Sequence, residues 1–295
     1  MPGSKEPGFL LCLFASGITV YNQGQKYLLR RSLTLILSYP LFEMPAIGIY
    51  LIVMAFLFGS IFASFITCTA WRVVRNEDWM LGHSHCDTCG HELSTADLFP
   101  IISYVALKGK CRYCGSKVPP RDLIFEIILG ILFAGTLALH GSIDAPVVAA
   151  LILEVLLLGL SLADWDSGVI PNGFLVAILV AWIITVPFMA DIREYAFEGI
   201  ISAACVGLVM VVVTAIIGKV KKTKMNYGPA KLVMCLMLFL HIRGACIAVG
   251  IGIVLGIIFA LVCKSKKKKV SLAPAISIAV VAALLLKDVL IPVIG

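Results

Sequence analysis

Apolar runs long enough to cross a lipid bilayer recur along most of this chain of 295 residues, of which 60% are hydrophobic and only 14% are charged. A helix needs about 20 mostly apolar residues to cross the hydrocarbon layer. Inside lipid, every backbone polar group must be hydrogen-bonded within the protein, which favours helices. The sequence therefore predicts an all-α, polytopic membrane protein of about eight transmembrane helices, over residues 46–69, 123–141, 146–163, 173–190, 196–218, 228–241, 244–263 and 271–293.

The basic residues predict how these spans are oriented. Cytoplasmic loops of membrane proteins carry an excess of lysine and arginine. If residues 70–122 are cytoplasmic, alternation of the spans places the lysine-rich stretches 219–224 and 264–269 on the same side. The net charge of +7 then reflects cytoplasmic loops beside membrane lipid, and no binding of nucleic acid is expected. We expect a multi-pass protein of the plasma membrane.

Four cysteines form two matching pairs in the one long polar stretch of the chain. Cys86 and Cys89 are the first pair, Cys111 and Cys114 the second, and a glycine follows each pair directly. Two Cys-x2-Cys pairs are typical of a tetrahedral Zn²⁺ site. Four protein ligands leave no position for water, so we expect a structural zinc ion that stabilises a cytoplasmic zinc-knuckle domain over residues 70–122. The alternative is a pair of disulfides or four unrelated thiols.

The first 43 residues fit this scheme poorly. The apolar stretch Phe9–Tyr21 is too short for a span, and a span there would leave Lys26 and Arg30 on the wrong side of the membrane. Met44 begins an almost uncharged run that has the character of a native membrane start. We therefore expect residues 1–43 to be a loosely held N-terminal extension or an upstream over-prediction of the start codon.

Three segments around the cysteine pairs carry a resemblance to a known family. The first predicted span ends in Ala-Ser-Phe-Ile-Thr-Cys-Thr-Ala-Trp-Arg at residues 63–72, and Pro-Arg-Asp-Leu-Ile-Phe-Glu at residues 120–126 opens the second. The third predicted span ends in residues 162–172, where Asp164 lies seven residues before Pro171 of an Ile-Pro pair. In combination with the cysteine loop, these segments resemble bacterial prepilin peptidases over roughly residues 50–290.

The resemblance implies an integral-membrane aspartic endopeptidase of the bacterial plasma membrane, with its four-cysteine loop in the cytoplasm. Such enzymes remove a short basic leader from type IV prepilin-like or pseudopilin substrates, whose mature part begins with an apolar helix. Many also methylate the new N-terminus with S-adenosylmethionine. Residues 44–69 would then be the first transmembrane helix and residues 123–295 the membrane peptidase domain, with Asp164 as one catalytic aspartate.

The second catalytic segment departs from the family's pattern. The family motif is Gly-x-Gly-Asp-x-Lys, whereas the aligned stretch here is Asn-Tyr-Gly-Pro-Ala-Lys-Leu at residues 226–232. Without a gap, Pro229 occupies the position of the aspartate, so the pair of carboxylates that the family uses is incomplete.

Other carboxylates are candidates for the missing group. Asp166 is the first, because a loop before the Ile-Pro pair would bring it towards Asp164, although in a helix the two would point apart. Glu126, which enters the membrane on the same side, is the next. Glu154 lies ten residues from Asp164, or about 15 Å deeper in the same span, which is too far to share a proton with it.

Three functional hypotheses follow. The first is a working leader peptidase that uses Asp164 and a substitute carboxylate. The second is a pseudo-enzyme that binds or escorts pilin-like helices without cutting them. The third is a methyltransferase whose peptidase half has decayed. Leader cleavage separates the first from the others, and methyl transfer to a pre-cut substrate separates the second from the third.

Overall fold

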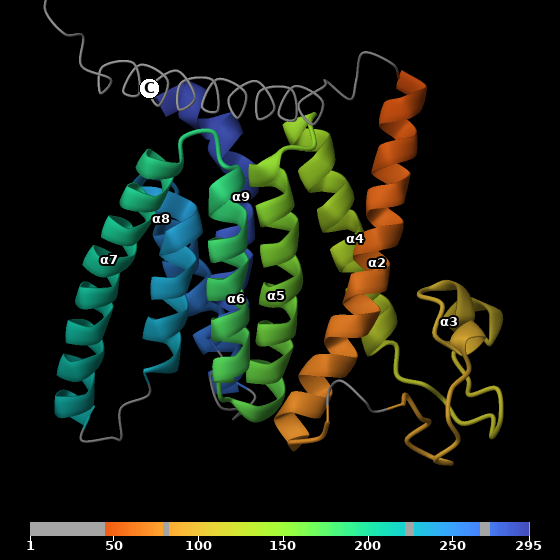
Figure 1. Ribbon diagram of the computed structural model, residues 1–295. Helices are drawn as coiled ribbons and strands as arrows, with labels where there is room; N and C mark the ends of the chain where they lie inside the picture. Colours follow the sequence, from red (N-terminus) through yellow and green to blue (C-terminus); the bar gives the residue numbers. More distant parts are fainter. Residues whose placement is uncertain (1–44, 79–82, 222–226, 266–271, 295) are drawn as a thin grey trace, which may run out of the picture.

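The computed structural model describes residues 45–78, 83–221, 227–265 and 272–294. In this part of the chain, long helices stand side by side in a bundle (Figure 1): α2 (Pro45–Arg75), α4 (Arg121–His140), α5 (Ala145–Ser167), α6 (Asn172–Thr185), α7 (Ile192–Lys221), α8 (Gly228–Ser265) and α9 (Ala273–Ile294). The short segments η1 (Thr95–Asp97) and α3 (Ile102–Ala106) lie between α2 and α4, and η2 (Val186–Phe188) follows α6. The all-α prediction is confirmed.

The helices have the length and composition of membrane spans. Four of those described are long and apolar enough to cross a membrane: Ala46–Arg75, Arg121–His140, Ala145–Ser167 and Ile192–Ile216. Three further apolar stretches are shorter: Asn172–Phe188, Gly228–Leu240 and Ala273–Leu285. The chain is thus a membrane protein, as predicted. The expected extension, residues 1–43, lies outside the described residues.

The two predicted spans 228–241 and 244–263 are joined in one continuous helix, α8. Two hydrogen bonds locate the parts of the chain on either side of the second half of this helix. Trp182 Nε1, near the end of α6, donates to Leu238 O in the first half of α8 at 3.0 Å. Ala273 N, at the start of α9, donates to Asp164 at the opposite end of the bundle. Seven residues lie between Ser265 and Ala273, so the Cα atoms of these two residues are at most about 29 Å apart. The 38 residues of α8 would measure about 57 Å if straight, so its second half must turn back. Residues 242 and 243, between the two predicted spans, are helical as well, and the expected reversal of the chain is retained.

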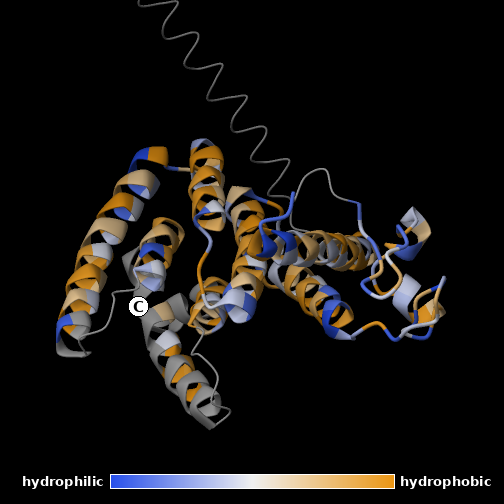
Figure 2. Cartoon of the chain, turned by 90° about the horizontal axis from the view of Figure 1, so that it is seen from below, coloured by the Kyte–Doolittle hydropathy of each residue, from blue (hydrophilic) through white to orange (hydrophobic). Residues whose placement is uncertain are grey.

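One end of the bundle gathers the features that matter for function. The loop between α2 and α4 that contains the four cysteines, here called the cysteine loop, emerges at the lower end in Figure 1. The last turn of α5 and the first turns of α8 and α9 lie at the same end. We call this the loop end of the bundle. Seen from below in Figure 2, the cysteine loop projects to one side of the helices and does not cover them.

Helices α2 and α4 approach closely because glycines line their contact. A Cβ atom added to Gly59 would lie only 2.7 Å from Leu129 O and 2.9 Å from the Cα of Gly130. Ser60, which is buried beside them, donates a hydrogen bond to Glu126 O at 3.1 Å. Small residues at such a crossing let two membrane helices pack backbone to backbone.

Gly59→Ala should therefore destabilise the bundle, because its new methyl group meets backbone atoms that cannot rotate away. Overpacking of this kind costs about 1–3 kcal/mol. The measurement is the unfolding free energy of the purified protein in detergent. Gly135→Ala is the matched control, since a Cβ atom at Gly135 meets nothing within 4 Å. Equal stability of the two variants would mean that the close α2–α4 contact is absent.

Candidate functional site

The two cysteine pairs adopt the same backbone turn. In each, the glycine N–H donates to the carbonyl of the first cysteine, at 2.8 Å for Gly90 and Cys86 and at 3.0 Å for Gly115 and Cys111. The N–H of the first cysteine donates in turn to the carbonyl five residues later, at 3.0 and 2.8 Å. Both glycines have positive φ, 69° and 70°, a conformation that strains a residue with a Cβ atom. This explains why a glycine closes each pair.

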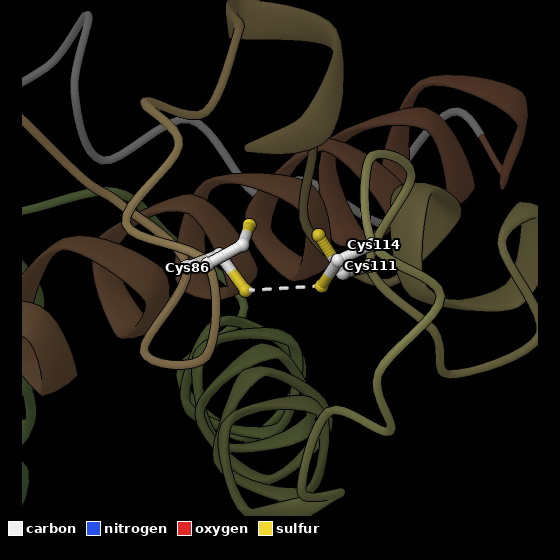
Figure 3. Close-up of side chains that lie close together, drawn as sticks. Cys86, Cys111 and Cys114 are labelled. Carbon is white, nitrogen blue, oxygen red and sulfur yellow. Dashed lines mark hydrogen bonds between the residues drawn. The ribbon is translucent and has the colours of Figure 1, made fainter.

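These turns bring the four thiols together. The sulfur atoms of Cys86, Cys89, Cys111 and Cys114 all lie within 4.8 Å of one another, and none of them forms a disulfide. Figure 3 shows Cys86 facing the second pair, with Cys86 Sγ and Cys114 Sγ 3.9 Å apart. Sulfurs that bind a tetrahedral Zn²⁺ at about 2.3 Å are about 3.8 Å from one another. The cluster therefore has the dimensions of a site that could hold a metal ion.

The electrostatics of the cluster favour a bound cation. The N–H groups of Cys89 and then of Thr88 lower the pKa of the Cys86 thiol to about 6, which favours its thiolate. Although the His91 N–H acts in the same direction on Cys89, burial and the neighbouring sulfurs raise the pKa of Cys89 to about 11. One thiolate thus forms readily, and crowding of the sulfurs opposes a second negative charge unless a cation is present.

A polar clamp that the sequence did not indicate holds the second cysteine pair to the segment before α3. Asp97 accepts hydrogen bonds from Ser94 Oγ at 2.7 Å, Arg112 Nε at 2.6 Å and Tyr113 OH at 3.1 Å. These donors, with that of Ser94 first, lower the pKa of Asp97 to about 2. The ring of Tyr113 also lies 3.7 Å from that of His91, centroid to centroid, and so joins the two pairs. His91 is therefore part of the packing around the cluster.

A buried carboxylate attaches the cysteine loop to the membrane helices. Glu126, in α4, is 7% exposed, and its Oε2 accepts a hydrogen bond from Ile101 N at 2.7 Å. Ile101 has φ of 60°, which is strained for a β-branched residue. The hydrogen bond to Glu126 helps to hold that conformation. Glu126, a sequence candidate for a catalytic carboxylate, thus binds the loop backbone in this structure.

Asp164 lies at the loop end of the bundle, where α5 meets the start of α9. Its side chain is buried, and Oδ2 accepts a hydrogen bond from Ala273 N at 3.0 Å. A carboxylate in this position satisfies a free N–H of the first helical turn and interacts favourably with the helix dipole. Asp164 therefore fastens α9 to α5, whatever chemistry it also performs.

Asp166 points to a different neighbour. Its Oδ2 accepts a hydrogen bond from Arg121 Nη2 at 2.7 Å, so it pairs with the first residue of α4. Because α5 remains helical up to Ser167, residues 164 and 166 project in different directions. The structure does not bring these two carboxylates together.

The two remaining positions considered from the sequence supply no second carboxylate beside Asp164. Pro229 is in the first turn of α8, which contains no acidic residue, and a missing N–H is tolerated there. Glu154 is 2% exposed and accepts a hydrogen bond from Thr136 Oγ1 at 2.5 Å, so it joins α5 to α4 in the interior of the bundle.

Comparison with known proteins finds relatives for part of the chain. Residues 57–140 match the family model described as the bacterial peptidase A24 N-terminal domain, which here covers the second half of α2, the cysteine loop and α4. A Burkholderia pseudomallei protein named prepilin leader peptidase/N-methyltransferase is 38% identical over 98 residues. Proteins of the same name from Myxococcus xanthus and Bacillus subtilis are 30% identical over 171 residues and 28% identical over 166 residues. These matches support a member of the prepilin peptidase family.

The chain matches only part of each relative. The alignments cover 33% of this chain and 31% of the Burkholderia protein, 58% and 48% for Myxococcus, and 55% and 64% for Bacillus. The chain thus aligns with less than two thirds of the length of each. The family-model match ends before Asp164. No solved structure resembles the chain significantly.

Purified protein should carry close to one zinc ion per chain, and Cys86→Ser or Cys114→Ser should lower its zinc content and make residues 83–118 more sensitive to protease. Structural zinc sites contribute about 10–16 kcal/mol to the folding of small domains, so the loop should loosen when a ligand is lost. Metal analysis and limited proteolysis provide the measurements. Cys205→Ser, at an exposed free cysteine on α7, is the control and should keep its zinc. Full zinc content in the double variant Cys86→Ser/Cys114→Ser would contradict this assignment.

Proposed function

We propose that this chain is a membrane-embedded leader peptidase that cleaves the basic leader of type IV prepilin-like or pseudopilin substrates at the cytoplasmic face of the bacterial plasma membrane. The observation that carries the proposal is the buried carboxylate of Asp164 at the loop end of the bundle, in a member of this family. Ionisable side chains within membrane segments are costly and usually mark functional sites. A substrate with a polar leader and an apolar helix would present its scissile bond at this end, where water is available.

Two carboxylates that share one proton are needed for this chemistry. One accepts a proton from the attacking water, and the other donates a proton towards the carbonyl oxygen of the scissile peptide. Asp164 supplies one of them. Asp166 is our candidate for the other, because its ion pair with Arg121 is partly exposed, at 41% and 26% for the Arg121 and Asp166 side chains, and is worth only about 0–1 kcal/mol. Its use also requires the last turn of α5 to unwind.

A pseudo-peptidase that binds or escorts pilin-like helices is the second candidate function. Three observations favour it: Asp164 is engaged with Ala273 N, Asp166 is paired with Arg121, and Pro229 replaces the expected second aspartate. Substrate binding in this case does not require the two carboxylates to meet.

The cofactors follow from the same proposal. Zn²⁺ bound by Cys86, Cys89, Cys111 and Cys114 would be structural, since all four positions of a tetrahedral ion are then occupied by protein. S-adenosylmethionine would serve only if the chain also methylates its product, an activity that the name of its relatives includes. Methyl transfer to a pre-cut substrate tests that addition.

With a prepilin-like substrate, this chain should cleave more slowly than a family member with both aspartates, by about 10²–10⁴-fold, because Asp166 is paired with Arg121 and is not positioned beside Asp164. Asp164→Asn should abolish the residual cleavage, and Pro229→Asp should increase it. Asn still accepts a hydrogen bond through its amide oxygen, so Asp164→Asn keeps the contact with Ala273 N and isolates the chemical role.

Asp166→Asn tests the substitute carboxylate, and substrate binding by the unmodified chain separates the two candidate functions. If Asp166 is the substitute carboxylate, this variant should lose cleavage as completely as Asp164→Asn. If cleavage is absent in the unmodified chain while a prepilin-like substrate still binds, the pseudo-peptidase is correct. Cleavage that Asp164→Asn leaves unchanged would rule out a catalytic role for Asp164.

A further inference from the structure

The cysteine loop exposes a compact group of large apolar side chains. Leu98 and Phe99, just before α3, are 41% and 59% exposed, and Ile102 and Val105 within α3 are 63% and 64% exposed. Ser103 N and Oγ both donate to Phe99 O, at 3.1 and 2.8 Å, which folds the two parts of the group against one another. We call these four apolar residues the α3 apolar edge. Large apolar groups exposed together usually mark an interaction surface.

The α3 apolar edge lies beside the membrane helices. The residue between its two parts, Ile101, is hydrogen-bonded to Glu126, which is five residues after the first residue of α4, Arg121. Five residues of helix measure about 7.5 Å. Figure 1 shows α3 next to the lower part of α4, higher than the lower ends of α2 and α5, and Figure 2 shows the loop displaced sideways. The edge is therefore at the depth of the first turns of α4.

The spans expose apolar side chains at the same depth. Ile124 and Ile128, which flank Glu126 in α4, are 49% and 42% exposed, and Ile61 and Phe65 in α2 are 51% and 55% exposed. This part of α2 is level with Glu126, because the neighbouring Ser60 donates to Glu126 O. Apolar side chains on the outside of membrane spans face lipid. The α3 apolar edge thus continues a surface that is already suited to acyl chains.

We propose that the α3 apolar edge inserts into the lipid bilayer at the boundary between headgroups and acyl chains. Such an interfacial element buries apolar side chains to a shallow depth while its polar side remains in water. Lys108 and Lys110 follow α3 directly, and their long side chains can place ammonium groups among lipid phosphates. This role goes beyond substrate cleavage and holds equally for a peptidase or a pseudo-peptidase.

Insertion explains how the cysteine loop is positioned. Glu126 fixes one point of the loop backbone to α4, and the Asp97 clamp joins the segment before α3 to the second cysteine pair. A third attachment, to lipid, would prevent rotation of the loop about the Ile101–Glu126 contact. The cysteine cluster would then be held at a constant distance from the membrane surface.

Fluorescence quenching by lipid tests the proposal in the full-length, zinc-containing protein. Phe99→Trp and Ile102→Trp each add one tryptophan to the four native ones. In nanodiscs of phosphatidylcholine brominated on its acyl chains, the fluorescence added by either residue should fall by about half or more relative to non-brominated lipid, as for a shallowly buried ring. Glu92→Trp, at an exposed residue just after the first cysteine pair, is the control and should not be quenched.

The outcomes distinguish lipid from a protein partner. Zinc content confirms that each variant is folded, and the two insertion positions provide independent readings if one variant loses its metal. No quenching at either position would overturn the proposal. Protection that appears only when a prepilin-like peptide is added would also overturn it, and would assign the edge to substrate docking.

Discussion

The hydrogen bond between Ile101 N and Glu126 Oε2 determines where the cysteine loop sits relative to the membrane helices. A carboxylate buried between α2 and α4 needs a donor, since an unpaired polar group in such a place is expensive. The donor here is the backbone N–H of Ile101, a residue whose own backbone is strained, with φ of 60°. This one hydrogen bond therefore satisfies the buried carboxylate of Glu126 and also stabilises the strained backbone of Ile101. The close approach of α2 and α4 at Gly59 keeps that carboxylate in place.

Much of this architecture could be predicted from the sequence because lipid leaves few alternatives. Apolar runs must form helices, and their ends were located within a few residues, although α2 continues from the predicted end at residue 69 to Arg75. Residues 228–263 were harder, since the chain reverses there within a continuous helix, α8. Hydropathy indicates which segments are apolar enough to lie in a membrane. It does not distinguish a bent helix from two helices joined by a loop.

The part of the candidate site that could be predicted is the part in which the spacing of residues along the chain fixes a local turn. Paired cysteines followed by glycine define a local turn, so the cluster of four thiols could be expected from sequence alone. The contacts of Asp97, Glu126 and Asp164 could not, because each joins elements that are distant in the chain or lie in an irregular loop. Asp164 was identified by its motif, but its hydrogen bond to the first turn of α9 depends on how α5 and α9 pack.

The central proposal is that the cysteine loop, Asp164 and the start of α9, which lie at one end of the bundle, face the cytoplasm. Reporter insertions near Glu92 and near Lys267 in the full chain test it most directly. Glu92 lies in the cysteine loop, and Lys267 lies in the sequence between Ser265 and Ala273. The account predicts that both reporters are cytoplasmic. An external reporter at either position would contradict it.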